Sequence, residues 1–194
     1  MDEKWLTAAL EELALTKHME IDNIPSIDLY MDQLTTLFDQ NLAHKKRHSD
    51  DKLLTKTMIN NYTKNKLLKP AEKKKYTRDH IILMALLYEL KQISSMDDIE
   101  TLFSVIHAQE DRQDLETMYQ TYLDCDNQLL KDFPSQIQSI FALVKEKTTP
   151  VKSGEWLNEE DIEKINALLT ALLLFQRGVH YKRLGEKIID EVLK

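Results

Sequence analysis

The chain has 194 residues, with 42% hydrophobic residues, 30% charged residues and a formal net charge of −7, the balance of a soluble globular protein that is long enough to bury a core. Three glycines and four prolines are few for this length, which excludes the frequent turns of a sheet protein and favours long helices. The single cysteine, Cys125, excludes an internal disulfide and indicates a reducing compartment.

Apolar runs are short along the whole chain. The most apolar run, residues 167–175, has nine residues, whereas a helix needs roughly 20 to span a bilayer. The first residues, MDEKWLTAALEELAL, carry acids where a signal peptide has a basic start. We therefore expect a cytoplasmic protein with no membrane partner.

Apolar residues at helical spacing predict helices at the start of the chain. Residues 1–22 form one amphipathic segment. Pro25 can occupy the first turn of a second helix, expected over 26–42. The apolar positions of this second helix recur every three or four residues: Ile27, Tyr30, Met31, Leu34, Leu37, Phe38 and Leu42.

Residues 43–51, AHKKRHSDD, have no apolar periodicity and are expected to form a loop. Within this loop, His44 and His48 have an i, i+4 spacing that could hold a metal. No cysteine or acid joins them at a ligand-like spacing, and the three basic residues between them would repel a cation. We therefore expect no metal site here.

Thr55 is a good N-cap for a helix expected to end near residue 65. The residues of this helix expected to be buried are apolar: Met58, Ile59 and Tyr62. Those expected to be presented are basic or polar: Lys56, Thr57, Asn60, Asn61 and Lys64. Pro70 stops the helix from continuing, and residues 69–76, KPAEKKKY, suit a tight turn or a minimal hairpin.

The next helix is expected to be central, because residues 81–90 are apolar nearly all round. Thr77 can cap it, and Asp79 lies in its first turn. Ser95 and Asp98 resemble a capping box that opens a short helix through residue 106.

Helical patterns continue from residue 109 to the end of the chain. They cover residues 115–130 and 137–144 and are followed by a linker-like stretch, TTPVKSG, at 148–154. A further helix is expected after Asn158, and Gly178 is expected to separate it from a last helix over 184–193. The leucine-rich surface over 165–175 has three open interpretations, namely core, homodimer interface or ligand pocket.

Positive charge is concentrated in one stretch of the chain. Residues 45–78 hold twelve Lys/Arg and three acids, a net charge of +9, whereas the rest of the chain holds 14 Lys/Arg and 30 acids, a net charge of −16. An acidic body with one basic face suits a polyanion that is approached from one side. The alternative is an ordinary solvated surface rich in lysine.

The helix over 55–65 presents the side chains that groove recognition requires. Asparagine pairs bidentately with adenine, lysine reaches guanine or phosphate, and threonine is a natural phosphate contact. The basic turn over 69–78 would contact the DNA backbone with an affinity that falls as salt rises. The candidate DNA-binding residues are Lys56, Thr57, Asn60, Asn61, Lys64, Lys73, Lys74, Lys75 and Arg78.

Residues 55–103 resemble the N-terminal winged-helix domain of merR-type regulators. Residues 58–63, MINNYT, stand at the Thr-Ile-Arg-Tyr-Tyr-Glu type motif of that family, with Asn60 and Asn61 in place of its Arg and first Tyr. Lys66 stands in place of the glycine of a Gly-Leu-Leu, and residues 70–76 match a shortened wing. The resemblance implies a helix-turn-helix that binds DNA and a following region that dimerises and often senses a ligand.

Residues 24–130 more closely resemble a family of uncharacterised Firmicutes proteins. This resemblance rests on the stretches IDLYMDQLTTLFDQNL, LTKTMINNY and KKKYTRDHI. That family is a domain of unknown function thought to be related to merR, and its members are presumed regulators. It implies that the helix over 26–42 is the first, supporting helix of the motif.

Together these patterns predict an all-α protein, with a merR-like helix-turn-helix and a short wing followed by a C-terminal helical bundle. We expect an N-terminal amphipathic helix over 1–23, the winged helix-turn-helix domain over 24–108 and an all-helical region over 109–194. The expected function is a DNA-binding transcriptional regulator that forms a homodimer through its C-terminal helices. The alternative is a non-catalytic protein-interaction module that uses the same scaffold.

No catalytic residue and no cofactor is expected. The chain has no Gly-rich phosphate loop, no His-Glu-x-x-His and no cysteine pair. The neighbours of Cys125 are two aspartates, whose charges oppose formation of a thiolate. His80 and His107 lie near helix ends and are expected to be structural.

Overall fold

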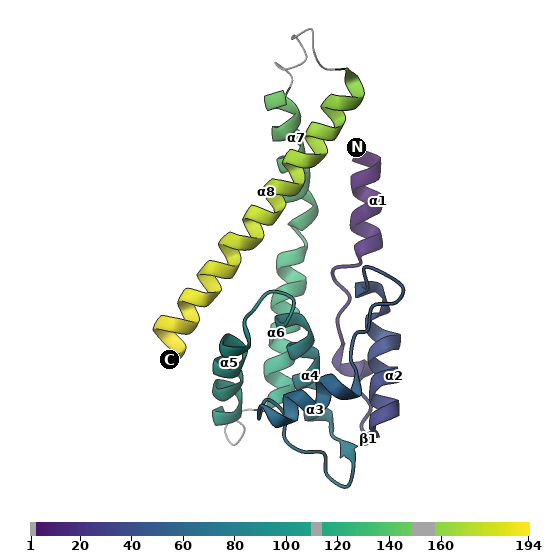
Figure 1. Cartoon of the computed structure of the whole chain (residues 1–194), viewed down its shortest axis with the longest axis vertical. Helices are drawn as coiled ribbons and strands as arrows, with labels where there is room; N and C mark the ends of the chain where they lie inside the picture. Colours follow the sequence, from purple (N-terminus) through teal and green to yellow (C-terminus); the bar gives the residue numbers. More distant parts are fainter. Residues whose placement is uncertain (1–2, 110–113, 149–157) are drawn as a thin grey trace. The chain divides into compact units, whose positions relative to one another are not determined.

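The computed structural model describes residues 3–109, 114–148 and 158–194, which are mostly helical (Figure 1). The all-α class is therefore confirmed, with one two-stranded sheet. The elements are α1 (Glu3–Leu13), η1 (Ile21–Asn23), β1 (Leu29–Tyr30), α2 (Met31–Leu42), η2 (Ala43–Lys45), α3 (Lys56–Lys64), β2 (Lys75–Tyr76), α4 (Arg78–Leu90), α5 (Met96–Gln109), α6 (Leu115–Leu130), α7 (Phe133–Thr148), α8 (Glu159–Ile188) and η4 (Ile189–Leu193). η1 and η2 are single 3-10 turns, and η4 is π-helical.

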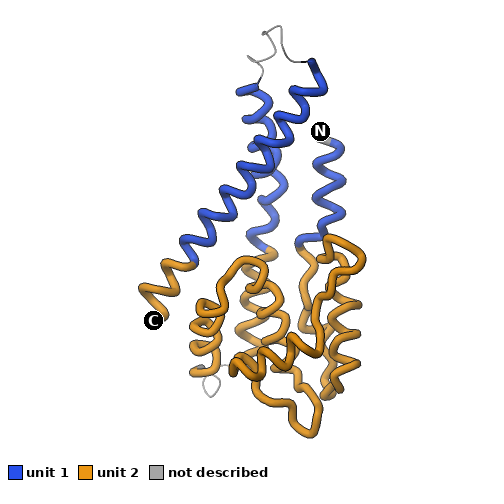
Figure 2. Tube along the Cα trace, in the orientation of Figure 1, with its two compact units in different colours: residues 1–15, 128–185 blue, residues 16–127, 186–194 orange. Residues whose placement is uncertain are grey.

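The chain divides into two compact units (Figure 2). Unit 1 comprises residues 1–15 and 128–185, and unit 2 comprises residues 16–127 and 186–194. These limits differ from the three segments expected from the sequence. Helices α6 and α8 each continue through a unit limit as one unbroken helix.

Unit 2 contains the larger hydrophobic core, and α4 lies at its centre. Seven of the thirteen residues of α4 are buried, which confirms the expected central helix. Several other elements pack against it with fully buried side chains: Leu34 and Phe38 of α2, Ile59 of α3, Leu67 and Leu68 after α3, Ile99 and Phe103 of α5, and Leu123 of α6. The Tyr119 hydroxyl of α6 donates to the Met19 carbonyl at 2.9 Å, inside this core.

Helix α2 starts five residues later than the apolar spacing indicates. Leu29 and Tyr30 instead form β1, which pairs antiparallel with β2, so that Leu29 faces Tyr76 and Tyr30 faces Lys75. Ile27 and Tyr30 are 68% and 52% exposed and do not belong to the buried stripe. The expected start at residue 26 is therefore wrong, because a strand 45 residues away along the chain overrides a spacing that also fits a helix.

Unit 1 has a smaller core. Leu6 of α1 packs there with Ile137 and Phe141 of α7. The first half of α8 also meets α7, where the Thr148 hydroxyl donates to the Asn166 side-chain oxygen at 2.7 Å.

Helix α8 corrects two expectations. It continues for 30 residues through Gly178, so the expected break there is wrong. One glycine costs a helix about 1 kcal/mol relative to alanine, which the surrounding helix formers outweigh. The core interpretation of residues 165–175 is wrong for its large side chains, because Leu168, Leu172 and Phe175 are all exposed. The expected linker lies outside the described residues, except for Thr148 at the end of α7.

Candidate nucleic-acid interface

Helix α3 is defined by a cap at each end. The Thr55 side chain accepts a hydrogen bond from the Met58 N–H at 3.2 Å, as expected of an N-cap. At the other end, the Leu67 N–H donates to the Tyr62 carbonyl at 2.9 Å and the Lys66 N–H to the Thr63 carbonyl at 3.1 Å. This is a Schellman motif, and Lys66 occupies its left-handed position with φ of 60°.

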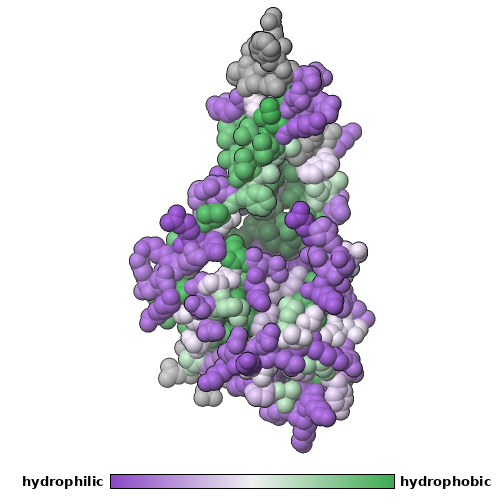
Figure 3. Space-filling model, in the orientation of Figure 1, coloured by the Kyte–Doolittle hydropathy of each residue, from purple (hydrophilic) through white to green (hydrophobic). Residues whose placement is uncertain are grey.

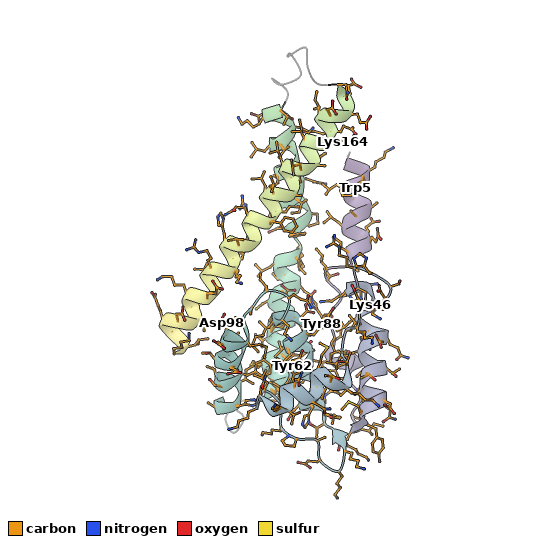
Figure 4. The ribbon with its side chains drawn as sticks, in the orientation of Figure 1. Trp5, Lys46, Tyr62, Tyr88, Asp98 and Lys164 are labelled. Carbon is orange, nitrogen blue, oxygen red and sulfur yellow. The ribbon has the colours of Figure 1, made fainter. Side chains whose placement is uncertain are left out.

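The two faces of α3 are divided as the sequence predicts. Ile59 and Tyr62 are buried against the core of unit 2, while Met58 is half-buried against it, and Tyr62 is labelled in Figure 4. The five presented residues are all exposed: Lys56, Thr57, Asn60, Asn61 and Lys64. At about 100° per residue, these five side chains share an arc of about 140° that excludes the buried positions. They therefore form one surface, which we call the α3 face.

Beyond α3 the chain turns back in a two-residue hairpin (Figure 1). Glu72 and Lys75 are bridged, with the Lys75 N–H donating to the Glu72 carbonyl at 2.8 Å. Lys73 and Lys74 form the tip, with φ of 49° and 67°. Two successive positive φ values define a type I′ turn, which asparagine and glycine favour and which lysine occupies at a cost of about 1–2 kcal/mol per residue. The expected minimal hairpin is confirmed, and its tip is strained.

His80 of α4 anchors the base of this hairpin. Its Nδ1 accepts from the Thr77 N–H at 3.1 Å, and its Nε2 lies 3.0 Å from the Lys69 carbonyl, to which it donates. The ring of Tyr76 meets the ring of His80 edge-on, with centroids 5.6 Å apart. Burial raises the pKa of the Tyr62 and Tyr76 hydroxyls, so no phenolate charge forms beneath the basic surface near neutral pH.

Tyr30 adjoins the hairpin, and no pattern in the sequence indicates this position. The pairing of β1 with β2 brings it opposite Lys75, whose Nζ lies 5.2 Å from the centroid of the Tyr30 ring. Lys75 is therefore engaged in a cation–π contact and is only half-buried. Only long-range strand pairing creates this neighbourhood, and the helical spacing around Tyr30 pointed to a different interpretation.

Arg78 occupies a different environment from the other candidate residues. Its guanidinium donates to the carbonyl of Ile21 at 3.1 Å, to the carbonyl of Ile24 and to the carboxylate of Glu116. The side chain is three-quarters buried. Arg78 thus ties α4 to η1 and α6, and its donors point into the protein.

Ion pairs reduce the charge of the basic stretch. The following Lys/Arg of this stretch pair with acids from outside residues 45–78: Lys45 with Glu89, Lys46 with Asp39 at 3.0 Å, Lys56 with Asp32 at 2.7 Å, and Arg78 with Glu116. These four acids lower the local net charge from +9 to +5. Within the described residues, Lys64, Lys73 and Lys74 make no ion pair and are exposed. They are the three most available cations of the α3 face and the hairpin.

The histidines of the loop after α2 do not share a helix. The turn η2 ends at Lys45, so no helix places His44 and His48 on one face. The Nε2 atom of His44 lies 3.1 Å from the Lys17 carbonyl. Across residues 3–109, 114–148 and 158–194, no group of three or more His, Cys, Asp or Glu side chains could hold a metal ion. Over the same ranges, every helix is too short or too polar for a bilayer span.

A family model described as a domain of unknown function, DUF1836, matches residues 19–122. The chain belongs to this family. No curated protein and no solved structure gives a match. The DUF1836 match runs from the segment before β1 into α6 and thus lies within the 16–127 part of unit 2. The α3 face and the hairpin are both inside it.

Proposed function

We propose that the chain binds double-stranded DNA as a cytoplasmic transcriptional regulator. In this proposal α3 enters the major groove and the hairpin contacts the phosphate backbone. The observation that carries the proposal is the α3 face, which is fully exposed next to a hairpin whose two tip residues are unpaired lysines. We include in it a homodimer through the C-terminal helices.

The proposed architecture is merR-like. Helix α2 would be the supporting helix, α3 the recognition helix and the hairpin a short wing. The connection between α2 and α3 covers residues 43–55, which is longer than the three- or four-residue turn of a strict helix-turn-helix. The proposal therefore uses the groove-facing helix and the wing, and it does not depend on a fixed angle between α2 and α3.

The chemistry of each position assigns its role. Asn60 and Asn61 project from the middle of the α3 face, where an amide can pair bidentately with adenine. Lys64, Lys73 and Lys74 have no internal partner to give up, so they are the residues we assign to phosphate. Lys56 would exchange an exposed pair with Asp32 for a phosphate. Arg78 and Lys75 already make internal contacts, and in our proposal they support the interface without touching DNA.

The strain at the hairpin tip supports this assignment. Asn-Gly would fit the type I′ turn of residues 73–74 better than two adjacent like charges do. Strained backbone is commonly retained at functional sites, where the surrounding structure compensates for it. Two lysines at this tip lower the stability of the folded chain, but their positive charges attract a polyanion.

The first test is retention of sheared genomic DNA at low salt. We expect the unmodified chain to be retained and Lys73→Glu with Lys74→Glu to abolish retention while helicity is unchanged. The matched control is Lys131→Glu with Lys147→Glu, two exposed lysines outside the basic stretch, which changes the net charge equally. Absence of retention by the unmodified chain, or equal loss in the control, would overturn the proposal.

A second test separates sequence reading from simple attraction. Selection from a random duplex library should enrich a defined site with the unmodified chain. Asn60→Ala with Asn61→Ala should lose this enrichment and keep the non-specific binding, because amides read bases and lysines bind phosphates. If the double variant still enriches the same site, the proposal that α3 reads bases in the major groove would be contradicted.

The alternative function is a non-catalytic protein-interaction module. The observation that favours it is the reduction of the local charge from +9 to +5 by internal ion pairs, which weakens the case for a polyanion. Capture from a nuclease-treated lysate distinguishes the two functions. A stoichiometric acidic protein that remains on the unmodified chain and leaves the Lys73→Glu, Lys74→Glu variant would favour the module.

A further inference from the structure

The middle and second half of α8 are exposed over most of their length. Every residue from 171 to 185 is exposed except Gly178, which is half-buried. A bare helix of this length is marginal in water, because helices in proteins depend mainly on packing of an apolar face. Figure 3 shows hydrophobic surface over the upper part of α8, whereas the end of α8 near the C-terminus is hydrophilic. Single exposed leucines are normal on a monomer, whereas here the exposed apolar residues are neighbours and form one continuous surface.

Helix α8 buries a largely polar side and exposes an apolar side, the opposite of an ordinary amphipathic helix. The side packed toward α7 buries Ile162, Asn166 and Thr170. The opposite side carries a stripe of large apolar residues at spacings of four, three and four: Leu168, Leu172, Phe175 and Val179. At about 100° per residue, these four side chains fall within an arc of about 60°. That narrow stripe has the spacing of a seam between two helices.

The charges of α8 identify what fits this seam. Residues 159–164 carry four acids and one lysine, a net charge of −3, and residues 177–187 carry four Lys/Arg and one acid, a net charge of +3. Residues 165–176 between them carry no charge. An antiparallel copy centred near Ala171 places apolar residues on apolar residues and each acidic end on a basic end. A parallel copy places like charges together.

We infer that a second copy of this chain covers α8, antiparallel and with a two-fold axis near Ala171. The interface is isologous, since both copies contribute the same stripe. Burial of the stripe supplies the affinity, and the charges at the two ends set the orientation, because exposed ion pairs add little affinity by themselves. The inference gives an orientation and a register to the homodimer of the proposed function, and it stands without any DNA.

The first test is sedimentation of the full chain without DNA over a concentration series. We expect a dimer, and we expect Leu172→Asp to raise the dissociation constant at least a hundred-fold. Leu184→Asp is the matched control, because Leu184 is equally exposed but lies on the other side of the helix. The inference would be overturned if the unmodified chain were monomeric at about 100 μM. Equal effects of the two variants would also overturn it.

A milder variant excludes an effect through folding. Phe175 is 76% exposed, so Phe175→Ala leaves the fold of one chain untouched. Its helicity and melting temperature, measured where the chain is dilute enough to be monomeric, should match the unmodified chain, while its dimer dissociation constant rises at least ten-fold. An unchanged dissociation constant would also overturn the inference.

Spin-label distances test the orientation. In a Cys125→Ser background, a label at Ala171→Cys should lie about 10 Å from its copy, the spacing of packed helices. A label at Tyr181→Cys, ten residues from the axis, should lie about 30 Å from its copy, given a rise of 1.5 Å per residue. Short distances at both positions would show a parallel pair and overturn the assignment.

Discussion

The two units of the chain bury their apolar residues to very different extents. Unit 2 surrounds α4 with buried side chains from α2, α3, α5 and α6, and the family match covers most of this unit. Unit 1 has a core of Leu6, Ile137 and Phe141 with a few partly buried neighbours, while a row of leucines on α8 stays exposed. The comparison indicates that unit 2 folds on its own packing, whereas unit 1 has apolar surface still to be covered.

One helix allows the largest test of this contrast. Leu123 and Leu129 both lie on α6, and they are 0% and 73% exposed. Leu123→Ala should lower the free energy of unfolding by about 3 kcal/mol through lost transfer energy and a cavity. Leu129→Ala should change it by less than about 0.5 kcal/mol. Urea denaturation measures both, and similar values would show that the two units are equally well packed.

Arg78 tests whether unit 2 is also held by buried polar contacts. Arg78→Ala removes the donor to two carbonyls and one carboxylate. Partly buried acceptors without donors should lower the free energy of unfolding by about 2 kcal/mol. Arg177→Ala, on the exposed part of α8, is the comparison in unit 1. If Arg78→Ala shifts the thermal midpoint no more than Arg177→Ala does, the three contacts do not stabilise the fold.

Unit 2 should also lose stability at alkaline pH. Burial, assisted by the neighbouring Tyr122, raises the pKa of Tyr119 well above its usual 10. The unfolded chain therefore releases this proton near pH 10 while the folded chain keeps it. Stability is unaffected below pH 10 and then falls by about 1.4 kcal/mol per pH unit for this residue. Tyr119→Phe should flatten the decline in urea titrations above pH 10, and an unchanged decline would contradict this assignment.

The smallest expected effect is a gain in stability. Lys66 adopts φ of 60° at the end of α3, where glycine avoids a penalty of about 1–2 kcal/mol. After the extra flexibility of glycine in the unfolded chain is subtracted, Lys66→Gly should raise the free energy of unfolding by about 0.5 kcal/mol. Asn65→Gly, at φ of −84°, should lower it. A loss of stability in Lys66→Gly would mean that the lysine side chain stabilises this cap.

The sequence predicts best where local chemistry decides the structure. The Thr55 cap, the buried face of α3, the apolar α4 and the Ser95 cap, whose hydroxyl accepts from the Asp98 N–H, are all local, and each is present. The start of α2 was misjudged because residues 29–30 pair with residues 75–76. The charge of the basic stretch was overestimated because acids such as Asp32 and Glu116 reach it only in the folded chain.

The core interpretation of the α8 leucines is wrong for a different reason. Their periodicity shows that Leu168, Leu172 and Phe175 share a face, but it does not say which molecule covers that face. Burial of Asn166 and Thr170 on the opposite side could not be read from hydropathy, because polar residues are normally placed outside.

The strand pairing beside the hairpin has a consequence for motion. It joins two residues of β1 to two of β2, and so short a ladder is marginal by itself. Its amides should therefore exchange with deuterium far sooner than those of α4, which lie in the core of unit 2. His80 holds the base of the hairpin, so the exposed tip of Lys73 and Lys74 would move while α3 stays fixed, and a partner would meet one rigid surface and one that adjusts to it.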